Sequence, residues 1–249
     1  MNILITGHEG FIGKNLWEYL SGFNDVKLTG LDITSGFDIT KDSLPKAIPS
    51  RDSIDVVIHL AGVGGVRESL DDPKKYWDIN VEGTRKVLNY FKNQHVLVAS
   101  SSSQYEPHLN PYAASKNIIE NIPHKKVCFM RFHTVYSDKP RKGMFFDKLF
   151  NNKLKYTTTH ERDFIHVSDI CKAIDKLIEC SIIGPVDIGT GHSIKICNIA
   201  PGLPIVINTV GERQKTCANL SKMKSLGWKP EIMIETFLKE NGYEYNSWY

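Results

Sequence analysis

The first half of the chain alternates short apolar runs with longer amphipathic stretches. The apolar runs are rich in Val, Ile and Leu, and they occupy residues 1–7, 26–32, 55–62, 95–101 and 126–132. Amphipathic segments such as residues 11–20 and 72–92 separate these runs and have a helix-like pattern. Continuous apolar strands that alternate with helices predict a doubly wound α/β fold, in which helices cover both faces of a parallel sheet.

This regular pattern fades after about residue 137. Pro, Gly and polar residues become more frequent, and the apolar segments become shorter. We therefore expect a large domain over residues 1–137 and a small, shortened C-terminal substrate-binding lobe over residues 138–249. The two are expected to be interleaved, because elements of the C-terminal half would complete the sheet.

Composition and charge narrow the functional class. The 249 residues are 41% hydrophobic and 24% charged, as in an ordinary globular protein. The net charge of +3, with both signs interleaved, argues against nucleic acid as a partner. The chain has no run of eighteen apolar residues and no signal-peptide pattern at its start, so we expect no membrane association and a cytoplasmic location.

The five cysteines have no close CxxC spacing. Four of them stand in apolar surroundings, which predicts buried free thiols rather than a disulfide framework or a zinc site. We expect no metal.

The first apolar run ends in TGHEGFIGKN, which places Gly7, Gly10 and Gly13 at three-residue intervals before a helix. Gly7 permits a tight turn, Gly10 lets the backbone approach a pyrophosphate, and Gly13 lets the helix pack against the strand. The helix that begins at Phe11 and Ile12 supplies N–H donors and the positive end of its dipole. The pattern predicts a Rossmann-like dinucleotide site.

The second apolar run ends at Asp32. A carboxylate there can accept hydrogen bonds from the adenosine ribose hydroxyls and would repel a 2′-phosphate, which predicts NAD rather than NADP. Asp38 and Ile39 are further candidates for contact with the adenine, although an ordinary turn explains Asp38 nearly as well.

The segment SSSSQYEPHLNPYAASK follows the fourth apolar run. Tyr112 and Lys116 stand four positions apart, so on a helix they share one face. A nearby ammonium favours the phenolate and lowers the pKa of a tyrosine from about 10 toward neutral pH, which makes Tyr112 a usable general base or acid. The hydroxyl of Ser101 or Ser102 can share the substrate oxygen with Tyr112.

These motifs resemble the extended short-chain dehydrogenase/reductase family of NAD-dependent nucleotide-sugar epimerases and dehydratases. The resemblance runs over nearly the whole chain, through TGHEGFIG, HLAG, NVEGT, ASSSS, YAASK, RFHTVY, RDFIHVSD and NLSKMKSLGWKP. It implies a UDP-sugar substrate and a reaction through a transient 4-keto sugar. It also implies that Leu60, Ala61, Gly62 and Asn80 line the cofactor side of the site, and that Thr134 lies near the nicotinamide and the sugar.

Two segments are most similar to UDP-glucuronate 4-epimerases, namely AGVGGVRESLDDP and RFHTVYSDKPRKGM. This similarity aligns Arg141 with the arginine that faces the uronate carboxylate in that group, and a guanidinium suits a carboxylate because it can bind both oxygens. A solvated charge in the basic loop is the alternative. Arg162 aligns with a diphosphate-binding arginine, or it forms a local ion pair. Arg67 and Arg213 are weaker candidates for substrate contact.

The chain also departs from the family. The segment between Ser101 and Tyr112 is shorter than in typical relatives, and Pro123 ends the helix of Tyr112 early. The segment PGLPIVIN stands where relatives continue into a helix. A homodimer is therefore possible, but a helix that relatives use for dimer packing is short here. No acid pair follows the serines, which argues against 4,6-dehydration. The remaining alternatives are an epimerase for UDP-glucose or a UDP-N-acetylhexosamine, a 4-keto sugar reductase, and a non-catalytic NAD-binding protein.

Overall fold

The computed structural model describes residues 1–207 and 209–243. The chain forms two compact units. The first unit contains residues 1–131 and 174–186, and the second contains residues 132–173 and the described residues from 187 onward.

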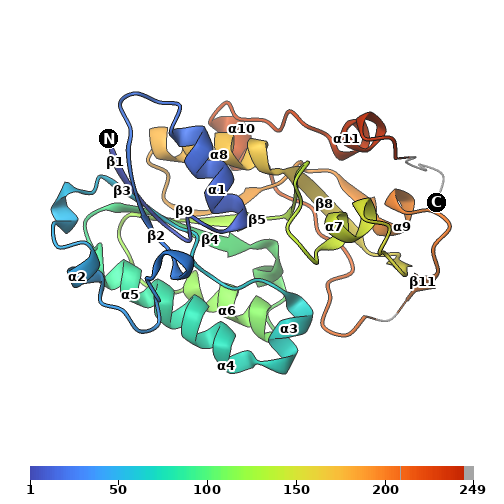
Figure 1. The fold of residues 1–249 in the computed structure, drawn as a ribbon, viewed down its shortest axis with the longest axis horizontal. Helices are drawn as coiled ribbons and strands as arrows, with labels where there is room; N and C mark the ends of the chain where they lie inside the picture. Colours follow the sequence, from blue (N-terminus) through green and yellow to red (C-terminus); the bar gives the residue numbers. More distant parts are fainter. Residues whose placement is uncertain (208, 244–249) are drawn as a thin grey trace. The chain divides into compact units, whose positions relative to one another are not determined.

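The first unit is built from alternating strands and helices (Figure 1). Its elements in chain order are β1 (Asn2–Thr6), α1 (Phe11–Leu20), β2 (Lys27–Leu31), η1 (Ile33–Ser35), α2 (Leu44–Ala47), η2 (Arg51–Ser53), β3 (Val56–His59), α3 (Val66–Asp71), α4 (Pro73–Tyr76), the π-helical turn η3 (Trp77–Glu82), α5 (Gly83–Tyr90), β4 (His95–Ser101), η4 (Ser102–Tyr105), α6 (Pro111–Ile119) and β5 (Val127–Phe132). Helix α8 (Val167–Glu179) and strand β9 (Gly184–Ile188) cross the boundary between the units.

The main sheet has six strands in the order β2-β1-β3-β4-β5-β9. The pairs β1–β2, β1–β3 and β3–β4 are parallel, which confirms the predicted Rossmann-like α/β class. After β1 the chain adds β2 on one side and then crosses to add β3 on the other, so the strand order reverses between β1 and β3. Ligands of open α/β sheets bind at the carboxyl ends of the strands at such a reversal.

Burial on both faces explains why these strands lack polar alternation. All four residues of β3 are buried, as are Ile3, Leu4 and Ile5 of β1. Helices α5 and α6 lie on one face of the sheet and α1 lies on the other (Figure 1). On the α5 and α6 face, Val87, Phe91 and Ile119 pack with residues of the strands in one core.

The second unit is built from short elements. They are β6 (Thr134–Tyr136), α7 (Phe145–Phe150), β7 (Thr157–Thr158), β8 (Glu161–His166), β10 (Ser193–Lys195), α9 (Ile196–Ile199), β11 (Ile205–Val206), α10 (Ser221–Ser225) and α11 (Ile234–Glu240). Strand β8 pairs with β10 and β6, and an aromatic core around Tyr136, Phe146, Phe164 and Phe237 packs beside it.

All five cysteines are free thiols, but only Cys128 and Cys171 are buried. The expectation of four buried thiols was therefore wrong. Cys180 follows the end of α8 and Cys217 lies between β11 and α10, and both are exposed. Among the described residues, no helix is long and apolar enough to cross a membrane.

Candidate active site

The glycine loop between β1 and α1 is the first part of the site. Gly7 has a φ of +76°, which favours glycine, and a Cβ there would lie 2.5 Å from the backbone nitrogen of Ala61. A Cβ on Gly13 would lie 2.1 Å from the carbonyl oxygen of Gly7. No side chain caps α1 at Gly10, so the N–H groups of its first turn are available to an anion.

Asp32 follows β2 at the same edge of the sheet. Its carboxylate accepts the backbone N–H (3.0 Å) and hydroxyl (2.9 Å) of Thr34, and also the N–H of Glu9 in the glycine loop (3.1 Å). Burial alone would raise the pKa of Asp32, but the hydrogen bonds from Thr34 and Glu9 outweigh burial and lower this pKa. Asp32 is therefore an ionised acceptor fixed against the glycine loop.

The side chains of Asp38 and Ile39, the two residues predicted to contact adenine, both have partners within the protein. The Asp38 carboxylate accepts hydrogen bonds from Thr40, pairs with Lys41 at 3.0 Å, and has a pKa lowered to about 2, chiefly by the Thr40 hydroxyl. Ile39 is buried in the core, where Gly83 packs against it. Its side chain is therefore turned away from solvent.

Residues Leu60, Ala61 and Gly62 continue from β3, and Asn80 holds the backbone beyond them. The Asn80 carboxamide accepts from the N–H of Val63 (2.9 Å) and donates to its carbonyl (3.1 Å). Asn80 also donates to the hydroxyl of Ser115 (3.0 Å), which in turn donates to the carbonyl of Tyr112 (2.8 Å). One buried amide therefore links the loop after β3 to helix α6.

Helix α6 carries Tyr112 and Lys116. Pro111 occupies its first turn and Asn110 caps it by accepting the N–H of Ala113 at 2.7 Å. The Lys116 nitrogen lies 6.0 Å from the centre of the Tyr112 ring and donates to the carbonyl of Ala99 in β4 at 2.7 Å. Burial lowers the pKa of Lys116 to about 8.

The two candidate serines lie where β4 ends. Ser101 and Ser102 are both buried, and the Ser101 hydroxyl caps η4 by accepting the N–H of Ser103 at 3.1 Å. This contact uses a lone pair of Ser101, so its proton remains able to be donated. Element η4 packs against α6, so the short connection keeps the serines near the helix that carries Tyr112 and Lys116.

The remaining predicted substrate contacts are arginines and one threonine. Arg67 lies in α3 of the first unit, whereas Thr134 begins β6 of the second unit. Arg141 is exposed in the loop before α7. Arg162, in β8, donates to the carbonyl of Glu161 (2.9 Å) and lies 3.6 Å from the carboxylate of Glu212.

Arg213 follows Glu212 directly and is half-buried. The Glu212 carboxylate also lies 3.3 Å from the ring of the fully buried His160. Arg162, Glu212 and His160 therefore form one cluster within the second unit. The Arg162 guanidinium is already paired with the Glu212 carboxylate in this structure.

Comparison with known proteins identifies the family of this chain. The model of the NAD dependent epimerase/dehydratase family matches residues 3–189. The chain belongs to this family. A UDP-glucuronate 4-epimerase of Thermodesulfobacterium geofontis is 29% identical over 95% of this chain and 93% of its own length. A putative UDP-glucose 4-epimerase of Methanocaldococcus jannaschii is 27% identical over 95% of this chain and 96% of its own length.

Solved structures share the fold of this epimerase/dehydratase family member. The UDP-glucuronic acid 4-epimerase of Bacillus cereus, solved with UDP-glucuronic acid and NAD, has a TM-score of 0.82 at 24% identity, covering 96% of this chain and 97% of that chain. The UDP-glucose 4-epimerase of Bifidobacterium longum, solved with NAD and UDP, has a TM-score of 0.79 at 21% identity. It covers 97% of this chain and 99% of that chain.

The family's cofactor is NAD, and the residues of the first unit fit it. The uncapped turn of α1 offers N–H groups to a pyrophosphate, and Asp32 offers an ionised acceptor for ribose hydroxyls. Among the described residues, no group of His, Cys, Asp and Glu side chains is arranged to hold a metal ion.

Sequence reasoning did not single out several residues that shape the site. His59 ends β3, is 1% exposed, and its ring nitrogens contact the hydroxyls of Thr6 (2.6 Å) and Thr84 (3.1 Å). Glu120 and Arg131 form a bidentate ion pair at the end of helix α6. The spacing of Glu120, four residues after Lys116, was the signal available for it.

His59 predicts an acid-sensitive stability. Burial, and secondarily the charge of Lys116, lower the pKa of His59 to about 3, whereas an unfolded histidine titrates near 6.5. Between these values the unfolded chain binds a proton that the folded protein does not, so stability falls as the pH drops. We expect His59 to contribute a loss of up to about 1.4 kcal/mol per pH unit below pH 6.5.

Urea unfolding of the wild type and of His59→Gln at pH 7, 6, 5 and 4 measures this contribution. The amide of Gln keeps groups for Thr6 and Thr84 but does not titrate. The free energy of unfolding should therefore fall less steeply with acid in the variant. Identical slopes in the two proteins would show that His59 is not the group responsible.

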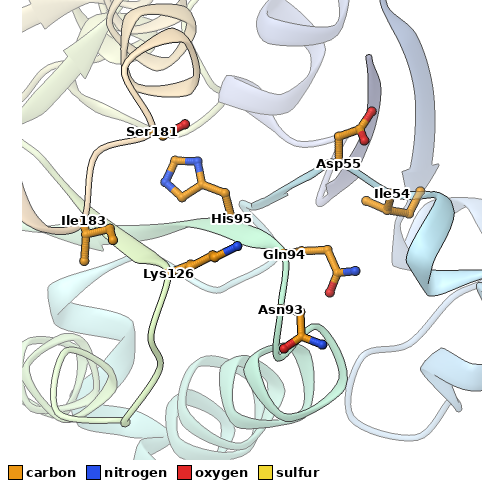
Figure 2. A pocket seen from close by; sticks show the side chains of 8 residues that line it. All are labelled: Ile54, Asp55, Asn93, Gln94, His95, Lys126, Ser181 and Ile183. Atoms are coloured by element: carbon orange, nitrogen blue, oxygen red, sulfur yellow. The ribbon is translucent and has the colours of Figure 1, made fainter.

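A cavity of about 400 Å³ lies at the opposite edge of the sheet. Figure 2 shows the side chains that line it, which are Ile54, Asp55, Asn93, Gln94, His95, Lys126, Ser181 and Ile183. These residues precede or begin β3, β4, β5 and β9, so the cavity faces the amino ends of the strands. It is therefore remote from the edge where open α/β sheets bind their cofactors.

Proposed function

We propose that this protein is a nucleotide-sugar 4-epimerase that interconverts UDP-glucuronate and UDP-galacturonate. The observation that carries the proposal is the pair of Tyr112 and the buried Lys116, at the carboxyl edge of the sheet that also bears the glycine loop. A protein that only bound NAD would have no need of a buried ammonium beside a phenol.

The chemistry assigned to these residues is proton transfer. Tyr112, whose ring centre lies 6.0 Å from the Lys116 nitrogen, removes the proton of the sugar 4-hydroxyl, and Ser101 or Ser102 donates a hydrogen bond to the same oxygen. Bound NAD supplies a hydride acceptor for C4 and later a hydride donor. Tyr112 returns its proton to the oxygen when the 4-keto sugar is reduced on its other face, so the net redox change is zero.

Residues 102–105 support epimerisation over 4,6-dehydration. Dehydratases of this family carry an acid pair just after the catalytic hydroxyl, and here the corresponding segment reads SSQY. Gln104 is buried there and cannot act as a carboxylic acid.

The choice of a uronate rests on two further points. The relative from Thermodesulfobacterium geofontis covers nearly the whole chain and is a UDP-glucuronate 4-epimerase. Arg141 is exposed, and its guanidinium suits a bidentate contact to a sugar carboxylate.

Purified protein incubated with UDP-glucuronate, without added NADH, should form UDP-galacturonate, which chromatography of the nucleotide sugars detects. In Arg141→Lys the loss of the bidentate contact should lower kcat/KM for UDP-glucuronate by about 10–100-fold. The neighbouring Lys142→Met is the matched control and should change kcat/KM little.

The other outcomes separate the alternatives. Turnover of UDP-glucose or UDP-N-acetylglucosamine alone would refute the uronate assignment but keep the 4-epimerase. Net consumption of NADH would indicate a 4-keto sugar reductase. A larger loss in Lys142→Met than in Arg141→Lys would move the carboxylate contact to Lys142.

A further inference from the structure

The Glu120 carboxylate, at the end of helix α6, accepts hydrogen bonds from side chains of two strands. It follows α6 directly, one turn after Lys116, and its side chain is 9% exposed. Arg131 of β5 donates from Nε to both carboxylate oxygens (3.1 Å each) and from a terminal nitrogen to one of them (2.7 Å). The hydroxyl of Ser100, beside Ser101 in β4, donates to the same carboxylate at 2.5 Å.

Arg131 extends this network to the loop between the serines and Tyr112. A terminal nitrogen of Arg131 donates to the hydroxyl of Tyr105 at 2.8 Å, and the guanidinium lies over the Tyr105 ring at 4.7 Å from its centre. Tyr105 is the last residue of η4, the turn that begins with Ser102. Glu120 and Arg131 therefore join α6, β4, β5 and η4, the four segments that surround the proposed catalytic set.

The same carboxylate acts on Lys116 electrostatically. Burial lowers the pKa of Lys116, and the negative charge of Glu120 opposes this by raising it. The other titratable groups at Lys116 are Tyr112 on α6 and His59 at the end of β3, and the low pKa of His59 keeps that ring neutral above pH 4. Arg131 offsets the charge of Glu120, so loss of either partner unbalances the charge near Lys116.

We propose that Glu120 and Arg131 are positioning residues for the reaction. Their ion pair fixes the serine-bearing end of β4 against the catalytic helix. The negative charge of Glu120 favours the charged form of Lys116, and Arg131 moderates this effect. Neither side chain touches the substrate in this role. The inference rests on the proposed function of Tyr112 and Lys116.

Direct titration of Lys116 tests the electrostatic part without any substrate. Full-length protein labelled with ¹³C at the lysine ε-carbon is titrated by NMR, and the Lys116 signal is assigned by its absence in Lys116→Met. In Glu120→Gln the unbalanced Arg131 should lower the titration midpoint by about one pH unit. In Arg131→Met the unbalanced Glu120 should raise the midpoint. The double variant Glu120→Gln/Arg131→Met, which lacks both charges, should have a midpoint between those of the two single variants.

Epimerase assays test the positioning part. Arg131→Lys keeps the charge but loses the bidentate contact to Glu120 and the planar guanidinium over the Tyr105 ring. We therefore expect kcat to fall about 10-fold, while the titration midpoint of Lys116 stays within about 0.3 pH units of the wild type. In Glu120→Gln the alkaline limb of the kcat profile should move to lower pH together with the midpoint. The half-buried ion pair between Glu82 of η3 and Arg85 of α5 supplies a matched control, since Glu82→Gln should change neither quantity.

A purely structural ion pair would give a different result. Glu120→Gln and Arg131→Met would then both lose stability or kcat while the Lys116 midpoint stayed unchanged or moved in the same direction, and the proposal would be wrong. If Arg131→Met does not fold, the midpoints of Glu120→Gln and the double variant still decide. Absence of epimerase activity in the wild type would count against the proposed function and would leave the NMR result standing.

Discussion

Replacing Tyr112 by Phe should lower kcat by about 10²–10⁴-fold and leave NAD bound, because general acid–base catalysis contributes a factor of that size. The variant removes one hydroxyl and keeps the ring. The edge-to-face contact with Tyr76, 6.1 Å between ring centres, and the place of the ring above Lys116 are therefore preserved. The variant thus removes the hydroxyl that is proposed as the proton acceptor.

Two measurements on the same preparation check this result. Turnover of UDP-glucuronate gives kcat, and the nucleotide released on denaturation gives the NAD content per chain. Tyr90→Phe is a matched control, because the Tyr90 hydroxyl donates to the carbonyl of Ile48, away from the site. Turnover within a few-fold of the wild type in Tyr112→Phe would refute the mechanism, whatever the substrate.

Replacing Gly13 by Ala should abolish NAD binding. The new Cβ would lie 2.1 Å from the carbonyl oxygen of Gly7 and 2.7 Å from the Cα of His8, and both are backbone atoms that no side-chain rotation can move. Either α1 shifts away from β1 or the glycine loop opens. Overpacking of this kind costs about 1–3 kcal/mol or more, out of a total stability of about 5–15 kcal/mol.

Calorimetric titration with NAD and thermal unfolding together measure this effect. We expect affinity for NAD to fall by at least about 100-fold, since an ångström-scale shift breaks the hydrogen bonds of the whole first turn. Gly22→Ala is the control at the other end of α1, where a Cβ would meet only the carbonyl oxygen of Tyr19 at 3.4 Å. Wild-type affinity in Gly13→Ala would show that the loop does not hold the pyrophosphate.

Much of the first unit could be predicted because its signals are local in sequence. Fully buried strands require continuous apolar runs, and the close approach of Gly7 and Gly13 to backbone atoms excludes any side chain there. The pair of Tyr112 and Lys116 was predictable for the same reason, since helical spacing alone puts both on one face.

Predictions that depended on neighbours remote in sequence were less secure. Ile39 was a candidate for adenine contact, but Gly83 of helix α5 packs against it and its side chain joins the core. Arg162 was a candidate for the diphosphate, and its carboxylate neighbour Glu212 lies fifty residues away in the chain.

The sequence by itself determined the alternation of strands and helices, the dinucleotide loop and the types of residue that can carry out the chemistry. These follow from periodicity and from steric limits within a few residues. Only the tertiary structure decided which charges stand together. It brought Glu120 to Arg131 and Ser100, and it buried Lys116 beside His59, because strands far apart in the chain become neighbours only when the sheet assembles. The pKa of Lys116 depends on that assembly, because burial lowers it and Glu120 raises it.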